Sequence, residues 1–249
     1  MKYILSILLT LSIFTITHAQ DLSALEIITK ADEQQRGDYN QGTIKMSIIR
    51  PDWTREMTMK TWASGTDYTA ILVTSPARDK GTAFLKRERE MWNWQPSIDR
   101  VIKMPPSMMS QSWMGSDFTN DDLVKQSSIV VDYTHEITGE ATLEGRTCWE
   151  ITLSPTEEAA VVWGKVISWV DQKDFLQLKT EFYDEDDYLV NTMYGKSIAE
   201  MGGRILPTIL EVVPADEEGH LTRVEYQKMD FKTPIKKNFF SIQQLKRLR

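Results

Sequence analysis

The side chains best suited to polar chemistry lie close together in the segment DFTNDD. Asp117, Asn120, Asp121 and Asp122 carry oxygen atoms that could bind Ca²⁺, but their spacing does not match an EF-hand loop and no Glu closes the twelve-residue frame. The alternative is that Thr119 or Asn120 caps a helix whose first turn carries two aspartates, where the helix dipole favours negative charge. Capping explains the pattern more simply. We therefore predict no metal site, although the sequence alone leaves ion binding by this segment open.

Other residue types that support catalysis are sparse and isolated. Beyond the first twenty residues the histidines are His135 and His220, and neither belongs to a G-x-S-x-G motif. His135 alternates with apolar residues, as a satisfied core histidine would. Cys148 has no basic neighbour to activate its thiol, zinc binding lacks paired His and Cys ligands, and no glycine-rich phosphate loop occurs. We expect no enzyme activity and no cofactor; the alternative is a carboxylate- or metal-dependent envelope hydrolase that uses Asp117 and Asp122.

A stretch rich in tryptophan and methionine precedes the acidic segment, between residues 91 and 115. Pro105 and Pro106 interrupt it, so it cannot be a central strand. Methionine side chains are flexible and polarizable, and they suit an apolar surface that adapts to a ligand. The residues that we predict to contact an apolar ligand are Trp92, Trp94, Met104, Met108, Met109, Trp113, Met114 and Phe118. The alternative is that these side chains only fill the mouth of a barrel.

The N-terminus has the features of a secretory signal peptide, which we assign to residues 1–19. A lysine precedes a largely apolar run from Ile4 to Ile16, and the small residue Ala19 precedes the expected cleavage point. This run is too short for a permanent anchor, and no other segment reaches the roughly 20 apolar residues of a transmembrane helix. No cysteine follows the cleavage point to accept a lipid. We expect a soluble, unlipidated periplasmic protein without stable membrane insertion.

Residues 20–249 have the length and composition of a single domain. The formal net charge is −7. An acidic protein repels nucleic acids and anionic bilayer surfaces, so neither is an expected partner. The one cysteine cannot form an internal disulfide. The stability of the fold must therefore come from its core.

Alternation of apolar and polar residues dominates the chain after residue 40 and predicts half-buried strands. Ile44, Met46 and Ile48 share one face of the first run, and Met57 and Met59 share one face of the second. Similar runs cover residues 67–74, 81–87, 90–94, 98–104, 129–137, 147–153, 161–170, 175–183, 188–198, 205–213 and 221–230. The short polar connections between them are typical of hairpins, so we predict about a dozen antiparallel strands.

Helical patterns are few. Residues 22–36 place apolar side chains, including Leu25, at helical spacing, and Ser23 with Glu26 resembles a capping box before a stop at Gly37.

Two shorter helices are predicted after Thr119 and over residues 241–249. The protein is therefore expected to be mainly β with a few helices. So many strands must curl into a barrel or pack as a sandwich to cover their apolar face. A curved sheet with helices lying in its mouth meets this requirement.

Two motifs resemble the outer membrane lipoprotein-sorting family, which includes LolA-like and LolB-like carriers. They are W-x-W-x-P-S-x-D-R-V-x-K-M-P-P over Trp92–Pro106 and W-M-G-S-D-F-T-N-D-D-L over Trp113–Leu123, and they are similar to an uncharacterised exported branch of the family. The resemblance implies an unclosed antiparallel β-barrel with helices forming a lid over an apolar cavity. It also implies that the protein carries lipoproteins or other lipids across the periplasm. Arg50 and Arg100 are candidates, by location, for the arginine that gates ligand binding in such carriers.

The expected ligand is an acyl chain. Each CH₂ removed from water contributes about 0.8 kcal/mol, so a lipid needs a carrier to cross an aqueous compartment. The residues expected to line the inner wall are Met46, Met57, Met59 and Trp149, with Ile44 and Ile151 beside them. The resemblance implies an inner-membrane transporter as donor and an outer-membrane acceptor. The alternative is a periplasmic accessory module that docks on a lipid-exporting transporter.

Overall fold

The computed structural model describes residues 22–124, 128–159 and 161–248. The predicted signal peptide, residues 1–19, lies outside the described residues. Within the described ranges, no helix combines the length and the apolar character needed to cross a bilayer.

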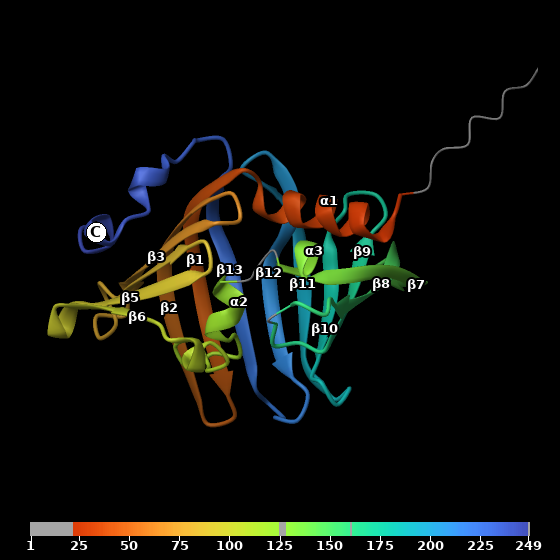
Figure 1. The fold of residues 1–249 in the computed structure, drawn as a ribbon, viewed down its shortest axis with the longest axis horizontal. Helices are drawn as coiled ribbons and strands as arrows, with labels where there is room; N and C mark the ends of the chain where they lie inside the picture. The colour runs from red at the N-terminus through yellow and green to blue at the C-terminus, as the bar shows by residue number, and fades with distance from the viewer. Residues whose placement is uncertain (1–21, 125–127, 160, 249) are drawn as a thin grey trace, which may run out of the picture.

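The described residues contain one antiparallel sheet of thirteen strands (Figure 1). The strands are β1 (Tyr39–Arg50), β2 (Trp53–Ser64), β3 (Tyr68–Ser75), β4 (Ala83–Arg87), β5 (Glu90–Gln95), β6 (Arg100–Lys103), β7 (Tyr133–Leu143), β8 (Arg146–Pro155), β9 (Lys165–Asp171), β10 (Gln177–Tyr183), β11 (Leu189–Met201), β12 (Arg204–Pro214) and β13 (Leu221–Asp230). Their order is β6-β5-β4-β3-β2-β1-β13-β12-β11-β10-β9-β8-β7, so the first and last strands pair in the middle and all other neighbours are consecutive in the chain. β6 and β7 end the sheet without pairing to each other. The predicted unclosed antiparallel barrel is therefore confirmed.

Four α-helices accompany the sheet in the described part of the chain: α1 (Ala24–Arg36), α2 (Asn120–Val124), α3 (Ser128–Val131) and α4 (Ile242–Leu245). At the start of α1, the Ser23 N–H donates to Glu26 Oε2 at 2.8 Å and the Glu26 N–H donates to Ser23 Oγ at 3.3 Å. This reciprocal pair confirms the predicted capping box. Gly37 ends the helix with a φ of 64°, a left-handed conformation that favours glycine.

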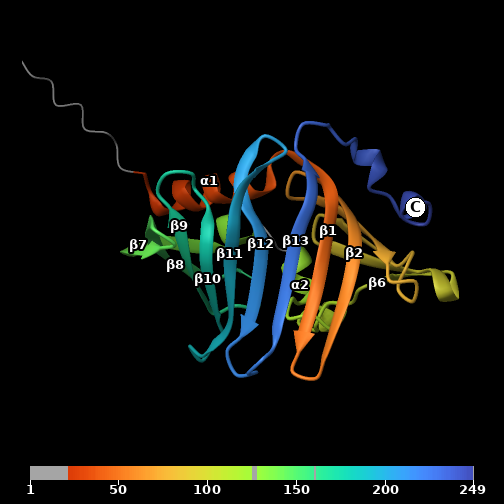
Figure 2. The same cartoon turned by 180° about the vertical axis from the view of Figure 1, so that it is seen from behind.

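The inner face of the sheet is the face that α1 and α2 cover. In Figure 2, β12, β13 and β1 lie in front of both helices, which places the helices on the far side of the sheet. α1 buries Ile27, Ile28 and Ala31 against inner-face residues of β8 and β9, including Ile151. Leu25, predicted to belong to this stripe, is instead 46% exposed, because Ile27 takes the position facing the sheet.

The outer face of β3 and β4 is covered by residues 231–248. Alternation along β3 sends Ile71 to the inner cluster and Leu72 to the outer one. Phe240, which is 1% exposed, packs with the outer set. The predicted C-terminal helix shortens to the four residues of α4, and it lies against the outer face rather than in the mouth of the barrel.

Two predicted strands begin four residues later than expected. Residues 128–131 form α3 because Ile129 and Val130, although adjacent, both pack against the α1 cluster, which successive residues of a strand cannot do. β9 begins at Lys165 rather than at residue 161. Just beyond α3, His135 Nε2 lies 2.6 Å from the Ile129 carbonyl oxygen, so this histidine is partnered, as predicted.

Lys86 is a charged residue buried at the edge of the inner face. Its residue surface is 8% exposed, and Nζ donates a hydrogen bond of 2.6 Å to the Thr66 carbonyl oxygen. Burial lowers the pKa of the Lys86 ammonium from 10.5 to about 8, because the charged form loses its hydration.

The pKa of Lys86 predicts a specific pH dependence of stability. Because the folded pKa of about 8 lies below the unfolded value of 10.5, the folded state is penalised below about pH 8 and the penalty disappears as the pH rises through 10.5. Lys86→Met should therefore raise the free energy of unfolding at pH 7 by roughly 1–3 kcal/mol. Urea denaturation at pH 7 and pH 9.5 checks this: the wild type should gain stability relative to the variant at the higher pH. An unchanged difference, or the same behaviour in Lys228→Met on the exposed surface of β13, would contradict it.

Candidate functional site

The segment between β6 and α2, residues 104–119, crosses the inner face and is called the arm here. The Met104 N–H donates to the Met91 carbonyl oxygen at 2.8 Å where the arm leaves β5 and β6. The Asn120 N–H donates to the Gln111 carbonyl oxygen at 3.0 Å, and the Asp121 N–H to that of Met109 at 2.9 Å. These bonds fold the arm onto itself, and few of its backbone groups pair with the sheet.

The tip of the arm is a tight hairpin turn. The Ser116 N–H donates to the Trp113 carbonyl oxygen at 2.9 Å, and the two central residues, Met114 and Gly115, have φ values of 54° and 79°. Two left-handed central residues define a type I′ turn. Glycine adopts this conformation freely, whereas in methionine it stores roughly 1–3 kcal/mol of strain.

Trp113 is pressed onto the inner face by this turn. Its residue surface is 3% exposed, and its ring meets the Phe84 ring edge-on with centroids 5.3 Å apart. Beneath it lie Met46, Met57 and Met59, each at most 1% exposed. We use the name floor cluster for the inner-face residues under Trp113, which are Met46, Ile48, Met57, Met59, Ile71, Val73, Phe84, Met91 and Val224.

Most of the predicted ligand-contacting residues gather at the floor cluster. Met104, Met109, Met114 and Phe118 pack against it from the arm, partly buried. The floor methionines therefore do not border an open cavity: the arm occupies the space above them. The buried Trp113 indole N–H has no hydrogen-bond partner. An unsatisfied buried donor costs roughly 1–3 kcal/mol, so burial of the indole N–H offsets part of the stabilisation from the apolar packing of Trp113.

Three predicted residues lie elsewhere. Trp92 and Trp94 belong to the outer cluster, because alternation along β5 directs Met91 and Asn93 inward and the tryptophans outward. Trp92 and Trp94 therefore do not lie beside Trp113, with which they were predicted to contact an apolar ligand. Trp149 lies on the inner face, but in the α1 half, where it stacks on Phe175 at a centroid distance of 5.8 Å.

An ion pair fastens the tip of the arm to the sheet. Arg50 Nη2 and Nη1, from β1, donate to Asp117 Oδ1 at 2.8 Å and Oδ2 at 3.1 Å, and both side chains are largely buried. Thr222 of β13 donates to Asp117 Oδ2 at 2.6 Å and accepts from the Asp117 N–H at 3.0 Å. Arg55 of β2 donates to the Met114 carbonyl oxygen at 3.1 Å. Three strands thus hold the turn through polar bonds.

Of the two arginine candidates, Arg50 makes this contact and Arg100 is exposed on β6. The sequence did not reveal Arg55 or Thr222. Both lie on strands far from the arm in the chain, and only the curvature of the sheet brings them to it.

The acidic residues after the turn serve the start of α2. The Thr119 N–H donates to Asp122 Oδ2 at 2.7 Å and the Asp122 N–H to Thr119 Oγ1 at 3.1 Å, which confirms capping by Thr119. Asp122 also accepts from Trp163 Nε1 at 3.3 Å, and burial raises the pKa of its carboxyl group. The side-chain amide of Asn120 donates from Nδ2 to the Met108 carbonyl oxygen at 2.9 Å. Because Asp117 is turned to Arg50, these oxygens do not converge on one point.

A cleft of about 320 Å³ opens beside Trp113, between the arm and β4 and β5. Its apolar walls include Phe84, Met104, Met108, Trp113 and Met114, and its polar walls include Arg78, Asp79, Asn93, Gln95, Gln111 and Ser112. Met108, the remaining predicted contact residue, is therefore on this cleft. The polar wall was not predicted from the sequence. The alternation of Asn93 with Trp92 and Trp94 does indicate that Asn93 lies on the opposite face of β5 from the two tryptophans.

Solved structures share this fold. A DUF1329 family protein from Desulfovibrio piger superposes with a TM-score of 0.81 at 22% identity, covering 89% of this chain and 97% of its own. A domain described as outer membrane lipoprotein-sorting, from Vibrio parahaemolyticus, gives 0.79 at 20% identity, covering 90% and 98%. A LolA superfamily protein from Nitrosomonas europaea gives 0.76 at 21% identity, covering 90% and 99%. No curated protein matches the sequence.

A protein-family model described as an uncharacterized protein matches residues 65–247, most of the chain. The chain belongs to the family that this model describes, and its fold is that of the LolA superfamily structure. The matched residues include the arm, the cleft and the floor-cluster residues of β3, β4 and β5, but not β1, which carries Arg50. In this fold the inner face of the sheet is covered in two halves, one by α1 and the other by the arm.

The ion pair of the arm should control its exposure. Asp117→Asn removes the charge that pairs with Arg50 while keeping the shape of the side chain, and the arm should leave the floor cluster more often. Limited digestion with chymotrypsin checks this: cleavage after Trp113 and Phe118 should become several-fold faster. Asp52→Asn, an exposed aspartate in the β1–β2 turn, is the control and should be cleaved like the wild type. Equal rates for all three proteins would show that the pair does not hold the arm.

Proposed function

We propose that this LolA-like protein is a periplasmic carrier that binds acyl chains of lipoproteins or other lipids on the inner face of its sheet. The observation that carries the proposal is the floor cluster under the arm: an apolar surface covered by an irregular segment instead of a paired strand. Displacing the arm leaves the hydrogen bonds of the sheet intact. It exposes Met46, Met57 and Met59, whose flexible side chains suit acyl chains of varied length.

The energies of opening and of ligand binding are comparable. Removing Trp113 and the arm methionines from the floor exposes several large apolar side chains, each worth roughly 1.5–3 kcal/mol. A lipid tail of some fourteen carbons returns about 10 kcal/mol when its CH₂ groups leave water. A lipid tail therefore returns a free energy similar to the one lost when the arm leaves, whereas a small polar solute returns far less.

The ties of the arm suit a carrier that must close after release. The Arg50–Asp117 pair, the Thr222 hydroxyl and the Arg55 bond to Met114 add polar interactions at the tip only. The strained Met114 backbone and the unsatisfied Trp113 N–H oppose closure. Closure is therefore favourable but limited, and this balance lets a bound lipid compete with the arm.

The site chemistry favours binding over hydrolysis. Asp117 and Asp122, the acids of the hydrolase alternative, do not act as a pair, because Asp117 faces Arg50 whereas Asp122 caps α2. Burial raises the pKa of the Cys148 thiol, which disfavours the reactive thiolate. We propose a non-enzymatic protein that receives its cargo from an inner-membrane transporter and passes it to an outer-membrane acceptor.

A second candidate function is an accessory module docking on a lipid-exporting transporter. The packed floor cluster favours it, because an inner face filled by the protein's own side chains needs no ligand.

Binding of a fluorescent fatty acid distinguishes the two functions. Arg50→Ala removes the tie of the arm, so the same ligand should bind roughly 5–30-fold more tightly than to the wild type, as expected when about 1–2 kcal/mol of closing free energy is lost. Arg87→Ala, an exposed arginine on β4, should bind like the wild type. Trp113→Ala is a poorer test, since truncating a buried tryptophan destabilises the fold by roughly 3–5 kcal/mol. If neither the wild type nor Arg50→Ala binds the probe, the carrier function is contradicted and the docking module is favoured.

A further inference from the structure

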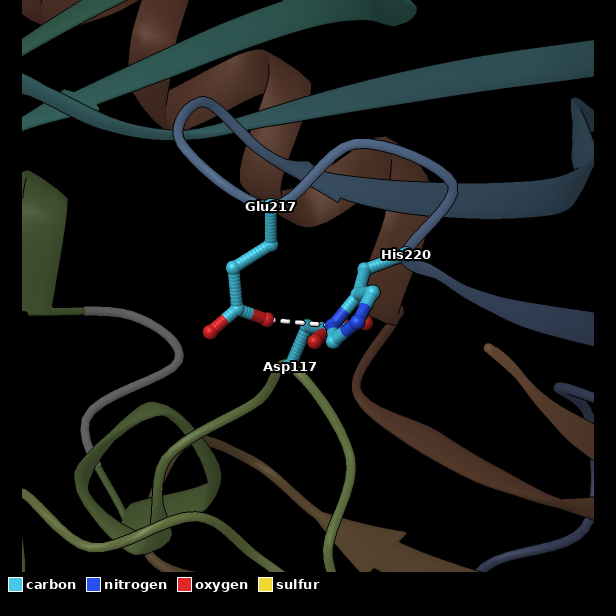
Figure 3. A group of neighbouring side chains, drawn as sticks. All are labelled: Asp117, Glu217 and His220. Atoms are coloured by element: carbon cyan, nitrogen blue, oxygen red, sulfur yellow. Dashed lines mark ion pairs between the residues drawn. The ribbon is translucent and has the colours of Figure 1, made fainter. Parts of the chain in front are cut away.

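Three side chains from two distant parts of the chain meet at the tip of the arm. Asp117 comes from the arm, and Glu217 and His220 come from the connection between β12 and β13. One ligand atom from each lies within 4.8 Å of the other two. Figure 3 shows the Glu217 carboxylate facing the edge of the His220 ring, with Asp117 next to the ring.

The imidazole of His220 is the best indicator of a ligand here. Its Nδ1 atom is shielded from solvent and pairs with a Glu217 carboxylate oxygen, so a ring nitrogen and a carboxylate oxygen already face each other beside Asp117. A shielded ring nitrogen normally donates to or accepts from a neighbour. The backbone N–H of His220 donates to the backbone carbonyl oxygen of Glu217 at 3.0 Å, so the turn itself holds the two side chains close together.

We propose that His220, Glu217 and Asp117 form a site for a divalent transition metal ion such as Zn²⁺. Imidazole nitrogen and carboxylate oxygen are ligands of Zn²⁺ at about 2.0–2.2 Å. Ligand atoms of a tetrahedral site lie roughly 3.3 Å apart, so a small movement of the exposed Glu217 side chain completes the set. The imidazole disfavours Ca²⁺ and Mg²⁺, which take oxygen ligands.

The neighbouring charges set the strength of this site. Asp117 Oδ2 already accepts from Arg50 and Thr222, while Oδ1 accepts one bond from Arg50 and keeps a lone pair for a metal. The positive charge of Arg50 opposes the cation, and the two carboxylates attract it. Binding is therefore weaker than in closed structural zinc sites and falls in the micromolar range.

A metal ion here would join the arm to the connection between β12 and β13. This consequence rests on the proposed function, because it matters only if the arm opens for a ligand; the metal site itself does not. The ion would bond Asp117 of the arm to Glu217 and His220 of the connection. It would hold the arm closed and slow the entry of a lipid.

Titration of the untagged protein with ZnCl₂ by calorimetry, and with Co²⁺ by visible absorption, tests the site without any lipid. The wild type should bind one ion with a micromolar dissociation constant. His220→Ala should weaken binding at least tenfold and Glu217→Gln several-fold. Glu218→Gln, an exposed neighbour, and His135→Gln, a histidine outside the cluster, should match the wild type. Circular dichroism confirms that each variant is folded.

Absence of saturable binding, or equal binding by His220→Ala, would overturn the site. The role of the ion in closure has its own readout: Zn²⁺ should slow association of the fluorescent fatty acid at least several-fold in the wild type but not in His220→Ala. Equal slowing in both, or none, would overturn that role. A protein that binds Zn²⁺ but no fatty acid would contradict the carrier function and leave the metal site standing.

Discussion

A thirteen-stranded sheet that does not close must have its apolar inner face covered by other parts of the chain. The arrangement of the other segments depends on this requirement. One half is covered by α1, a regular helix with a capped start that buries Ile27 and Ile28. The other half is covered by the arm, which contributes mostly single side chains. The first cover resembles an ordinary protein core, whereas the second can be replaced by another apolar group.

The irregularity of the arm follows from its sequence. Pro105 and Pro106 prevent it from pairing as a strand, and the left-handed turn at Met114 and Gly115 reverses it above the floor cluster. Its tip is then fixed by polar groups at the rim, where Arg50, Arg55 and Thr222 reach it from three strands. Apolar burial and rim polarity therefore act on the same few residues, and a change in either alters how often the arm is closed.

The sequence predicted what depends on local periodicity. The alternating runs gave the antiparallel strands, and the Ser23–Glu26 pair gave the start of α1. A cap by Thr119 or Asn120 was also predicted, because capping depends on neighbouring residues, and the bonds between Thr119 and Asp122 show that Thr119 is the cap.

The sequence did not predict which face of the sheet a side chain occupies where this depends on strand register, and it did not predict contacts between distant residues. Trp92 and Trp94 were grouped with Trp113, yet both lie on the outer face of the sheet, whereas Trp113 packs on the inner face. The ion pair between Arg50 and Asp117 joins residues 67 positions apart, and neither neighbourhood signals the other. The packing of the arm onto Met46, Met57 and Met59 likewise depends on the curvature of the whole sheet, which alternation does not encode.

Hydrogen–deuterium exchange with and without a saturating single-chain lipid tests the displaceable arm most directly. Lipid binding should speed exchange at the Asp117 backbone amide, which donates to the Thr222 hydroxyl of β13 at 3.0 Å and loses this partner when the arm leaves the sheet. The amides of β1 and β13 in the centre of the sheet should be unchanged. Lipid binding that leaves the Asp117 amide as protected as in the free protein would contradict a displaceable arm, because the lipid would then be bound without moving the arm.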